Sequence, residues 1–473
     1  MPRTAHHAPT TKLRPEMSLD PLYTAEEMKA AEAGHDVEAL MARAGRAVAE
    51  HAMRRFPDAR RFVAVCGKGA NGGDGRIAIE VLEEAGRAAR PVEEAPLDDA
   101  DVIVDALFGT GFHGEPREDA ARQIAEINAA KAPVVSVDLP SGVDASTGEV
   151  AGACVGADLT VTFHGPKVGL EVAPGRFHAG EVVVADIGLE PLATEHALVT
   201  PAILTQVPRR QPNQNKYTAG TVLVVGGSRG LTGAPSLASE AAFRADAGYV
   251  AVAVPDSTLA VFEQRLLETV KLPCPEDDGK ISPRAVEPIA EFASKAGSLA
   301  VGPGLGRGSG PKEVVRRLLE EVQRPAVVDA DALYDLDPFE RSAPTVLTPH
   351  EGELSRLLGV QADWVAAHRL EAVRRAAENF GCVCVLKGAD TLIAAPGQGV
   401  LVSSLGSPAL ATAGSGDVLT GIVAAFLAKG LEARLAAAAA VATQQLASTL
   451  IPQSGAIASD VIGALPLVLN APV

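Results

Sequence analysis

Short apolar runs of four to seven residues alternate with helical segments along the whole chain. In the first half this pattern predicts strands at 62–66, 101–106, 133–138, 158–163 and 181–186, and helices at 36–54, 72–86 and 116–130. Thr24 and Glu27 have the spacing of a capping box, which predicts the start of a further N-terminal helix. The alternation is typical of a mainly parallel sheet covered by helices on both faces.

The second half repeats this pattern. Strands are expected at 221–226, 249–254, 298–302, 326–330, 344–347 and 382–387, and helices at 234–246, 311–323, 352–358, 363–379, 415–428 and 431–450. Between the halves, residues 190–218 carry prolines and polar residues with little apolar pattern, as domain linkers do. The sequence therefore predicts two α/β domains, each a three-layer αβα arrangement with a mainly parallel sheet.

Length and charge narrow the classes of partner. A chain of 473 residues is long enough for two or three domains. Its 42 basic and 59 acidic residues give a formal net charge of −17, which speaks against broad attraction to nucleic acid or to an anionic membrane. If an anionic ligand binds, local geometry must hold it.

The compartment follows from the cysteines and the apolar runs. Five scattered cysteines form no disulfide framework, which fits a reducing compartment. No apolar run reaches the roughly 18 to 20 residues of a membrane span. Residues 1–16 carry basic and polar residues without an apolar core, so we expect a disordered leader and a cytoplasmic protein.

The strongest local signal of the first half is the glycine-rich segment 67–75, which holds five glycines in nine positions. It follows a predicted strand and opens a predicted helix, so bare backbone N–H groups and the helix dipole can hold a phosphate there. The alternative is a tight turn without a ligand. We favour the phosphate site because packing alone does not demand so many glycines.

Two further turns end strands of the same half, at 105–115 and 137–144. Parallel sheets build their binding crevice at these carboxyl ends. Asp138 ends the run Val134–Val137, where a half-buried carboxylate can move protons, although a lone aspartate is more often a cap. Oxygen donors, one per turn, could close around K⁺ or Mg²⁺: Asn71, Asp105 and Ser141.

In this order, the three turns resemble the NAD(P)H-hydrate epimerase domain, over about residues 17–200. That family has GxGNNGGDG in the phosphate turn, and here Ala70 replaces the first Asn, which removes a hydrogen-bonding group. The resemblance implies a Rossmann-like domain that interconverts the R and S forms of hydrated NADH and NADPH at C6, with Asp138 as acid and base. It implies K⁺ at Asn71, Asp105 and Ser141, and substrate contacts at Ala70, Asn71, Gly72, Gly73, Asp74, Gly109, Thr110, Gly111, Phe112, His113, Gly114, Glu115 and Asp138.

The second half has the strongest signal in the chain, the segment 408–421, which an apolar helix follows at once. Gly414, Ser415 and Gly416 present N–H groups where negative charge develops in phosphoryl transfer, and Asp417 can take a proton from an attacking hydroxyl. The alternative role of Asp417 is that of a helix N-terminal residue favoured by the dipole. Further turns follow strands at 226–235, 301–306, 329–331, 348–353 and 385–391, and together they favour a single crevice.

These turns resemble the ribokinase-like fold and, more closely, the ADP-dependent NAD(P)H-hydrate dehydratase, over about residues 205–473. The matching motifs are GSGDVLTG, TPHEGE, GPGLG and KGADT. The resemblance implies that the C6 hydroxyl, deprotonated by Asp417, attacks the terminal phosphate of ADP with Mg²⁺ present, and that elimination leaves NAD(P)H, phosphate and AMP. It implies hydrate contacts at Ala234, Gly304, His350 and Asp417, and nucleotide contacts at Lys387, Gly388, Ala389, Asp390, Thr391, Ala413, Gly414, Ser415 and Gly416.

Two other functions remain open at this point. The second domain could be a small-molecule kinase of the same fold, for example for a vitamin precursor, joined to a nucleotide-binding domain. The first domain could instead be a ligand sensor or scaffold without catalysis. We also expect a homo-oligomer, because the alanine-rich helix 431–450 leaves an apolar face to cover.

Overall fold

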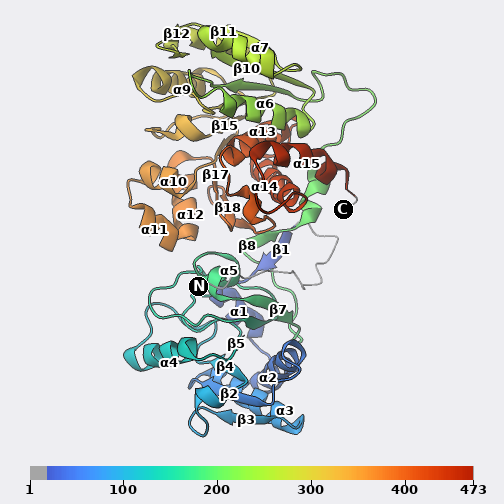
Figure 1. Cartoon of the computed structure of the whole chain (residues 1–473), viewed down its shortest axis with the longest axis vertical. Helices are drawn as coiled ribbons and strands as arrows, with labels where there is room; N and C mark the ends of the chain where they lie inside the picture. The colour runs from blue at the N-terminus through green and yellow to red at the C-terminus, as the bar shows by residue number, and fades with distance from the viewer. Residues whose placement is uncertain (1–18, 472–473) are drawn as a thin grey trace. The chain divides into compact units, whose positions relative to one another are not determined.

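The computed structural model describes residues 19–471, so the leader expected at 1–16 lies outside the described residues. The chain divides into two compact units, the first built on Pro21–Ala197 and the second on Leu198–Val365 and 371–471. Each unit is an α/β layer structure of its own (Figure 1). The prediction of an α/β fold with mainly parallel sheets is confirmed.

The sheet of the first unit has six strands in the order β3-β2-β4-β5-β6-β7. All neighbouring pairs are parallel. The strands are β2 (Arg61–Cys66), β3 (Ala88–Pro91), β4 (Val102–Ala106), β5 (Val134–Val137), β6 (Leu159–Phe163) and β7 (Glu181–Ala185). Their carboxyl ends therefore meet at one edge, where the turns after β2, β4 and β5 come together.

Helices cover both faces of this sheet. They are α1 (Ala25–Glu32), α2 (Val37–Arg55), α3 (Ala70–Glu84), α4 (Glu118–Ala129) and α5 (Val168–Glu171), with 3-10 turns η1 (Leu97–Asp99) and η2 (Gly175–His178). Buried residues of α2 and α3 form a core on one face, and Ile124 and Ile127 of α4 form a core on the other. The capping box expected at Thr24 and Glu27 opens α1.

The larger sheet has eleven strands in the order β1-β8-β19-β18-β17-β16-β15-β14-β9-β10-β11. They are β1 (Leu19–Leu22), β8 (His196–Val199), β9 (Thr221–Val225), β10 (Tyr249–Pro255), β11 (Val270–Cys274), β14 (Ser298–Val301), β15 (Ala326–Val328), β16 (Thr345–Leu347), β17 (Val383–Leu386), β18 (Thr391–Ala394) and β19 (Leu401–Ser403). The run from β11 to β17 is parallel, and β17, β18 and β19 pair antiparallel. A separate hairpin joins β12 (Glu276–Asp277) to β13 (Lys280–Ile281).

The helices of the second unit are α6 (Gly233–Arg244), α7 (Leu259–Arg265), α8 (Val286–Ala293), α9 (Ser309–Glu321), α10 (Glu351–Leu358), α11 (Ala362–Ala367), α12 (Arg369–Phe380), α13 (Ser415–Ala428), α14 (Ala433–Thr449) and α15 (Ala458–Asn470). Its 3-10 turns are η3 (Pro201–Gln206), η4 (Asp256–Thr258), η5 (Pro283–Ala285), η6 (Ala330–Leu333) and η7 (Pro408–Leu410). Helices α6, α13, α14 and α15 pack against one another as one layer (Figure 1).

Helix α14 corrects the expectation about oligomers. Its run Ala436–Ala440 is fully buried, because α13, α15 and the sheet of the same chain cover it. The alanine-rich helix therefore leaves no open apolar face, and the reason given for a homo-oligomer is wrong.

Most predicted elements occur within a few residues of their expected bounds. The predicted helix 363–379 is two helices, α11 and α12, and the sequence pattern missed β3, β11, β18, β19, α7, α8 and α15. The stretch 190–218, expected to be irregular, contains β8 and η3. Within residues 19–471, no helix is long and apolar enough to cross a membrane. All five cysteines are free thiols.

Candidate active sites

The glycine turn of the first unit joins β2 to α3. Helix α3 begins at Ala70, directly after Gly69. A Cβ atom on Gly67 would lie 2.1 Å from the carbonyl oxygen of Leu107, and one on Gly72 would lie 1.9 Å from that of Gly67. The expectation that packing does not demand these glycines is therefore wrong for Gly67 and Gly72. In contrast, Gly69 has open space around it, so its lack of a side chain leaves room at the helix start.

Asp138 follows β5 and is buried, with 7% of its surface exposed, whereas the sequence suggested a half-buried residue. Its backbone has φ = 66°, a left-handed conformation that non-glycine residues rarely adopt. Its Oδ1 atom lies 2.7 Å from Nζ of Lys167, which is fully buried. The hydroxyl of Thr162, in β6, donates to the same Oδ1 at 3.0 Å. Oδ1 of Asp138 therefore has two partners, Lys167 and Thr162.

Two more carboxyl groups stand near Asp138. Asp74, in the first turn of α3, is 9% exposed, and its pKa is raised to about 8 by burial and then by the charges of Asp138 and Glu32. The pKa of Glu32, the last residue of α1, is raised by burial and by Asp138, against the lowering effect of Lys167. The site thus combines one buried ion pair with a carboxyl group that keeps its proton at neutral pH.

The three oxygen donors proposed for a cation are partly brought together. Asp105 ends β4 and is fully buried, and Ser141 donates to it through its hydroxyl at 2.6 Å and its backbone N–H at 2.9 Å. Burial raises the pKa of Asp105, and the hydrogen bonds from Ser141 and Ser136 oppose that rise. The side chain of Asn71 lies against Gly109, and its enclosed Nδ2 has no hydrogen-bond partner among the described residues. Carboxylate, hydroxyl and amide oxygens are donors that fit a hard monovalent cation.

The loop Gly109–Glu115 follows β4 and borders this edge of the sheet. The rings of Phe108 and Phe112 stack with their centroids 4.7 Å apart, which orders the start of the loop. His113 is exposed, as a solvent-facing loop residue would be. The structure gives it no partner that decides its role.

In the second unit, Asp417 lies in the first turn of α13, after Gly414 with φ = 88°. A Cβ atom on Gly414 would lie 2.6 Å from Cδ1 of Leu237, so this position has little room for a side chain. The pKa of Asp417 is raised to about 7 by burial and by the charge of Asp329, against the lowering effect of Lys387. A carboxyl group with this pKa can accept and return a proton near neutral pH.

Lys387 ends β17 and lies next to this turn, since a Cβ atom on Gly416 would be 3.3 Å from its Nζ. Nζ lies 3.0 Å from Oδ1 of Asp329 and 3.8 Å from Oε2 of Glu353. Burial alone would lower the pKa of Lys387, but the charges of these two carboxylates outweigh it and hold the pKa above its ordinary value. The other oxygen of Asp329 accepts a 2.8 Å bond from the buried hydroxyl of Thr420, in α13.

The residues expected to contact the hydrate lie at strand and helix ends. His350 is the N-cap of α10, and its Nδ1 accepts hydrogen bonds from the backbone N–H groups of Gly352 and Glu353 at 3.0 and 3.3 Å. This leaves the imidazole exposed. Gly304 has φ = 58° after β14, and Ala234 lies in the first turn of α6.

The residues expected to hold the nucleotide fall into two segments. Lys387 to Thr391 connect β17 to β18, and the hydroxyl of Thr391 donates to the carbonyl of Gly388 at 3.0 Å. The segment 413–416 forms the turn into α13, where the side-chain amide of Gln444 donates to the carbonyl of Ser415 at 2.5 Å. Hydrogen bonds within the second unit therefore hold both segments in place.

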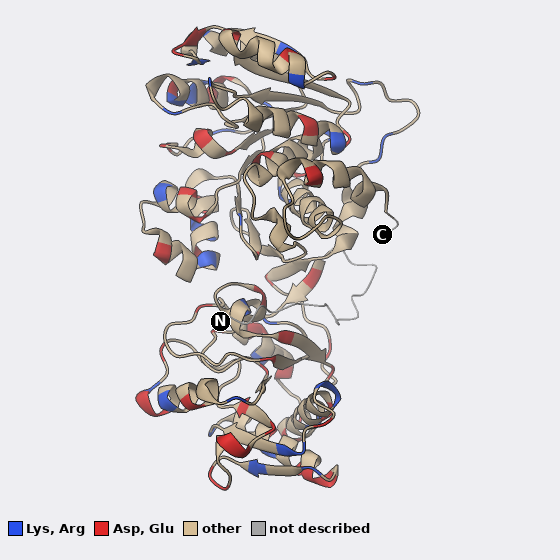
Figure 2. Cartoon of the chain, in the orientation of Figure 1, with Lys and Arg blue, Asp and Glu red and all other residues tan. Residues whose placement is uncertain are grey.

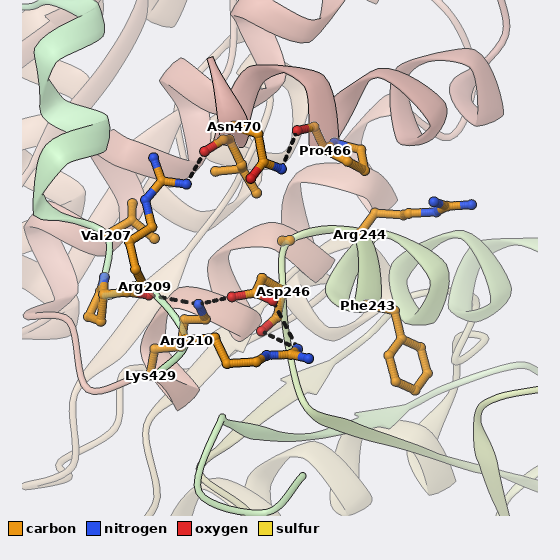
Figure 3. A pocket seen from close by; sticks show the side chains of 12 residues that line it. Val207, Arg209, Arg210, Phe243, Arg244, Asp246, Lys429, Pro466 and Asn470 are labelled. Carbon is orange, nitrogen blue, oxygen red and sulfur yellow. Dashed lines mark hydrogen bonds and ion pairs between the residues drawn. The ribbon is translucent and has the colours of Figure 1, made fainter. Parts of the chain in front are cut away.

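A cavity of about 430 Å³ lies elsewhere, at the end of α13 opposite Asp417 (Figure 3). Three of the four basic side chains that line it form ion pairs or hydrogen bonds. Lys429 and Arg210 lie 2.6 and 2.9 Å from the carboxylate of Asp246, and Arg209 donates to the carbonyl of Leu469. These contacts lie where α6, α13 and α15 end, so we assign the cavity a structural role in joining these helix ends. Along the ribbon of each unit, acidic and basic residues are interspersed (Figure 2).

Comparison with known proteins decides the family. A family model for NAD(P)H-hydrate dehydratase matches residues 222–465, and a model for the YjeF-related protein N-terminus matches residues 37–96 and 77–169. The bifunctional NAD(P)H-hydrate repair enzyme Nnr of Moorella thermoacetica is 40% identical over 91% of this chain and 92% of its own. The chain belongs to the family of bifunctional NAD(P)H-hydrate repair enzymes.

Other relatives agree with this assignment. The repair enzyme Nnr of Escherichia coli is 32% identical over 91% of this chain and 89% of its own. The crystal structure of an ADP/ATP-dependent NAD(P)H-hydrate dehydratase from Bacillus subtilis, co-crystallised with ATP and Mg²⁺, covers 57% of this chain and 96% of its own at a TM-score of 0.51 and 27% identity. A ribokinase-like protein from Enterococcus faecalis, with a TM-score of 0.51 and 22% identity over 59% of this chain and 97% of its own, supports the fold.

The function expected from the sequence, a repair enzyme with an epimerase domain and a dehydratase domain, is thereby confirmed. In this NAD(P)H-hydrate repair enzyme the sequence reasoning missed three residues of the sites: Lys167, Thr162 and Thr420. Lys167 lies in an undistinguished loop after β6, and only the pairing of β5 with β6 brings it to Asp138. A single lysine after a strand matches no sequence motif, so the sequence offered no reason to select it.

Proposed function

We propose that the first unit epimerises hydrated NADH and NADPH at C6 of the nicotinamide ring, with Asp138 exchanging the proton. Substrate contacts are assigned to Ala70–Asp74 and Gly109–Glu115. Support comes from the position of Asp138 at the carboxyl end of β5, at the same edge of the sheet as the turn that opens α3. Ala70 weakens the contact at its position, because a methyl group forms no hydrogen bond.

K⁺ is proposed at Asn71, Asp105 and Ser141. The support is the buried carboxylate of Asp105, which has only neutral hydrogen-bond donors among the described residues. The ion would supply positive charge that helps to hold the phosphate groups of the substrate near the glycine turn. The residues around it bind and orient the substrate, and Asp138 holds the proton.

We propose that the second unit removes water from the (6S) epimer in a reaction that consumes ADP. Asp417 accepts the proton of the C6 hydroxyl, whose oxygen then attacks the terminal phosphorus of ADP and displaces AMP. The phosphate ester loses phosphate from C6 and a proton from C5, which restores the ring double bond of NADH or NADPH. The observation that carries this proposal is a buried carboxyl group with a pKa of about 7 at the start of α13, behind glycine N–H groups.

The other residues of the second site bind and orient. We assign the hydrate to Ala234, Gly304, His350 and Asp417, and the nucleotide to Lys387–Thr391 and Ala413–Gly416. Mg²⁺, present in the crystals of the similar Bacillus subtilis enzyme, would neutralise phosphate charge. The carboxylates of Asp329 and Glu353 are oxygen donors of the kind that it takes.

One incubation tests both halves. The protein is mixed with a hydrate of both epimers, K⁺, Mg²⁺ and either ADP or ATP, and recovery is followed at the nicotinamide absorbance. Full recovery with ADP, with AMP and free phosphate as products, is expected. Recovery that stops at the starting share of one epimer contradicts the epimerase assignment, and a stable phosphate ester as product contradicts the dehydratase assignment.

A further inference from the structure

The ammonium group of Lys167 is fully bonded inside the first unit. Its Nζ atom lies 2.7 Å from Oδ1 of Asp138, 2.8 Å from Oγ1 of Thr162 and 2.8 Å from the carbonyl oxygen of Phe163. An ammonium group has three N–H donors, so each has an acceptor. The lysine is fully buried, and a charged group in such a position is stable only when it is paired in this way.

The backbone of Lys167 is fixed as well. Lys167 forms a parallel bridge with Tyr23, and the backbone N–H of Tyr23 donates to the carbonyl of Pro166 at 3.0 Å. The N–H of Val168 donates back to the carbonyl of Tyr23 at 3.1 Å. The ammonium group therefore occupies a defined position relative to β6.

Because of this pairing, the two carboxylate oxygens of Asp138 have different surroundings. Oδ1 is committed to Lys167 and Thr162. Among the described residues no hydrogen bond to Oδ2 is formed, and Oδ2 is not among the enclosed polar atoms that lack a partner. The left-handed backbone of Asp138, at φ = 66°, is one that non-glycine residues rarely adopt, and together with the ion pair it fixes the direction of the side chain. Oδ2 is therefore the oxygen that a substrate can reach.

Asp74 lies in α3, a helix that contacts β5 and begins at the carboxyl edge of the same parallel sheet. The charged groups that act on it are Asp138, at the end of β5, and Glu32, at the end of α1. The charge of Lys167 opposes the rise in the pKa of Glu32, and burial and then Lys167 lower the pKa of His164. The buried Nε2 atom of His164 has no hydrogen-bond partner among the described residues. The buried ammonium group thus compensates one of the three carboxyl groups directly, and that one is Asp138.

We propose that Lys167 is the positioning residue of the epimerase, which binds Oδ1 of Asp138 and leaves Oδ2 turned to the hydrate, and that Asp74 is the acid that works with it. One base and one acid in the same site can act at the same pH when their surroundings differ in this way. This inference rests on the proposed epimerase site and gives two further residues their roles in it.

The proton transfers balance without any other reactant. In the hydrate, C6 carries a hydroxyl group and is bonded to the ring nitrogen. Asp138 Oδ2 accepts the hydroxyl proton, the C6–O bond becomes a carbonyl, and the C6–N bond breaks with its electron pair going to nitrogen, which takes the proton of Asp74. After rotation about C5–C6, nitrogen attacks the other face, Asp74 regains its proton and Asp138 returns the proton to oxygen. Nothing is oxidised or reduced.

The test uses the full chain and the two epimers separately, in the presence of ADP, Mg²⁺ and K⁺. Recovery from the (6R) epimer requires both domains, whereas recovery from the (6S) epimer requires the second domain alone. Lys167→Met is expected to lower kcat from the (6R) epimer by about 10² to 10⁴ with a smaller change in KM, the range for loss of acid and base catalysis. The rate from the (6S) epimer serves as an internal control, and Lys131→Met, an exposed lysine of the same unit, is the matched control.

Lys167→Arg keeps the charge and is expected to recover part of the lost rate. An unchanged kcat from the (6R) epimer in Lys167→Met overturns the inference, as does a loss that Lys167→Arg does not relieve. If Asp138→Asn leaves epimerisation intact, the proposed epimerase site itself fails. If Asp138→Asn abolishes it and Lys167→Met does not, only the present inference fails.

A second measurement holds even if Lys167→Met does not fold. Asp74 must keep its proton to act as the acid, so kcat/KM from the (6R) epimer is expected to fall as the pH rises through about 8. In Asp74→Asn this fall is expected to disappear, because the amide does not titrate, and the rate at lower pH is expected to drop by about 10². A variant with the same alkaline fall as the wild type overturns the role of Asp74.

Discussion

Nζ of Lys387 lies 3.0 Å from Oδ1 of Asp329, close beside the glycine turn that carries Asp417. Asp329 raises the pKa of Asp417, and Lys387 lowers it. The charges of the two residues therefore have opposite effects on the pKa of Asp417, which lies at about 7 with both present. Removing either charge alone is expected to move the titration of the base.

Lys387→Met is the corresponding variant. Asp417 acts as a base only when ionised, so the rate of dehydration of the (6S) epimer is expected to rise with pH through about 7 in the wild type. Without the ammonium group the pKa of Asp417 increases, and this rise moves to more alkaline pH. The measurement is the pH profile of kcat/KM with ADP saturating. An acid limb that stays in place, or moves to lower pH, contradicts the pairing.

Thr420 is expected to stabilise the second unit through its bond to Asp329. In Thr420→Val the shape is kept, but the buried Oδ2 atom of Asp329 loses its 2.8 Å hydrogen bond. Leaving a buried acceptor without a donor costs about 1 to 3 kcal/mol of unfolding free energy. Thr420→Ser keeps the hydroxyl and serves as the control, and denaturant unfolding measures both. Equal stability of the Val and Ser variants would show that the bond contributes nothing.

Two glycines of the first turn are expected to respond differently to alanine. In Gly72→Ala the new Cβ atom would lie 1.9 Å from the carbonyl oxygen of Gly67, so the turn must open, at a cost of about 1 to 3 kcal/mol or more. Gly69 has φ = −89° and nothing within 4 Å of the added atom, so Gly69→Ala is expected to fold normally. The readout is recovery from the (6R) epimer together with thermal unfolding. Equal behaviour of the two variants would contradict the packing described for Gly72.

Potassium removal is expected to affect one domain only. Replacing K⁺ with tetramethylammonium, which is too large for a site formed by Asn71, Asp105 and Ser141, should slow recovery from the (6R) epimer and leave recovery from the (6S) epimer unchanged. Ser141→Ala should reduce the response to K⁺, because it removes a donor and the 2.6 Å bond to Asp105. A K⁺ response in the (6S) reaction alone would place the ion in the other domain.

The sequence predicted what depends on local pattern. Strand β5 was recognisable because Val134–Val137 is a continuous apolar run, and α13 because an apolar helix follows the GSGD turn. Asp138 was recognisable because it follows β5 at the edge where ligands bind, and Asp417 because it lies in the first turn of α13. In each case the signal lies within about ten residues of chain.

The sequence pattern could not predict which residues meet across a sheet or between a helix and a sheet. Lys167 reaches Asp138 only because β5 and β6 pair in parallel, and Thr420 reaches Asp329 across the interface of α13 with β15. Strands β18 and β19 are four and three residues long and pair antiparallel at the end of a parallel run, and the hydrophobic periodicity of the sequence does not indicate this change of direction. The alanines of α14 suggested an open face because alanine does not distinguish a helix–helix contact from an exposed surface.

The central claim is that each unit uses its own carboxylate on the same hydrated nucleotide, Asp138 for epimer exchange and Asp417 for dehydration. The most direct test measures NADH formation from the separate epimers with Asp138→Asn and Asp417→Asn. Asp138→Asn should lose recovery from the (6R) epimer and keep recovery from the (6S) epimer, whereas Asp417→Asn should lose both while R and S still interconvert. Recovery from the (6S) epimer by Asp417→Asn at the wild-type rate, or normal epimer exchange by Asp138→Asn, would contradict the account.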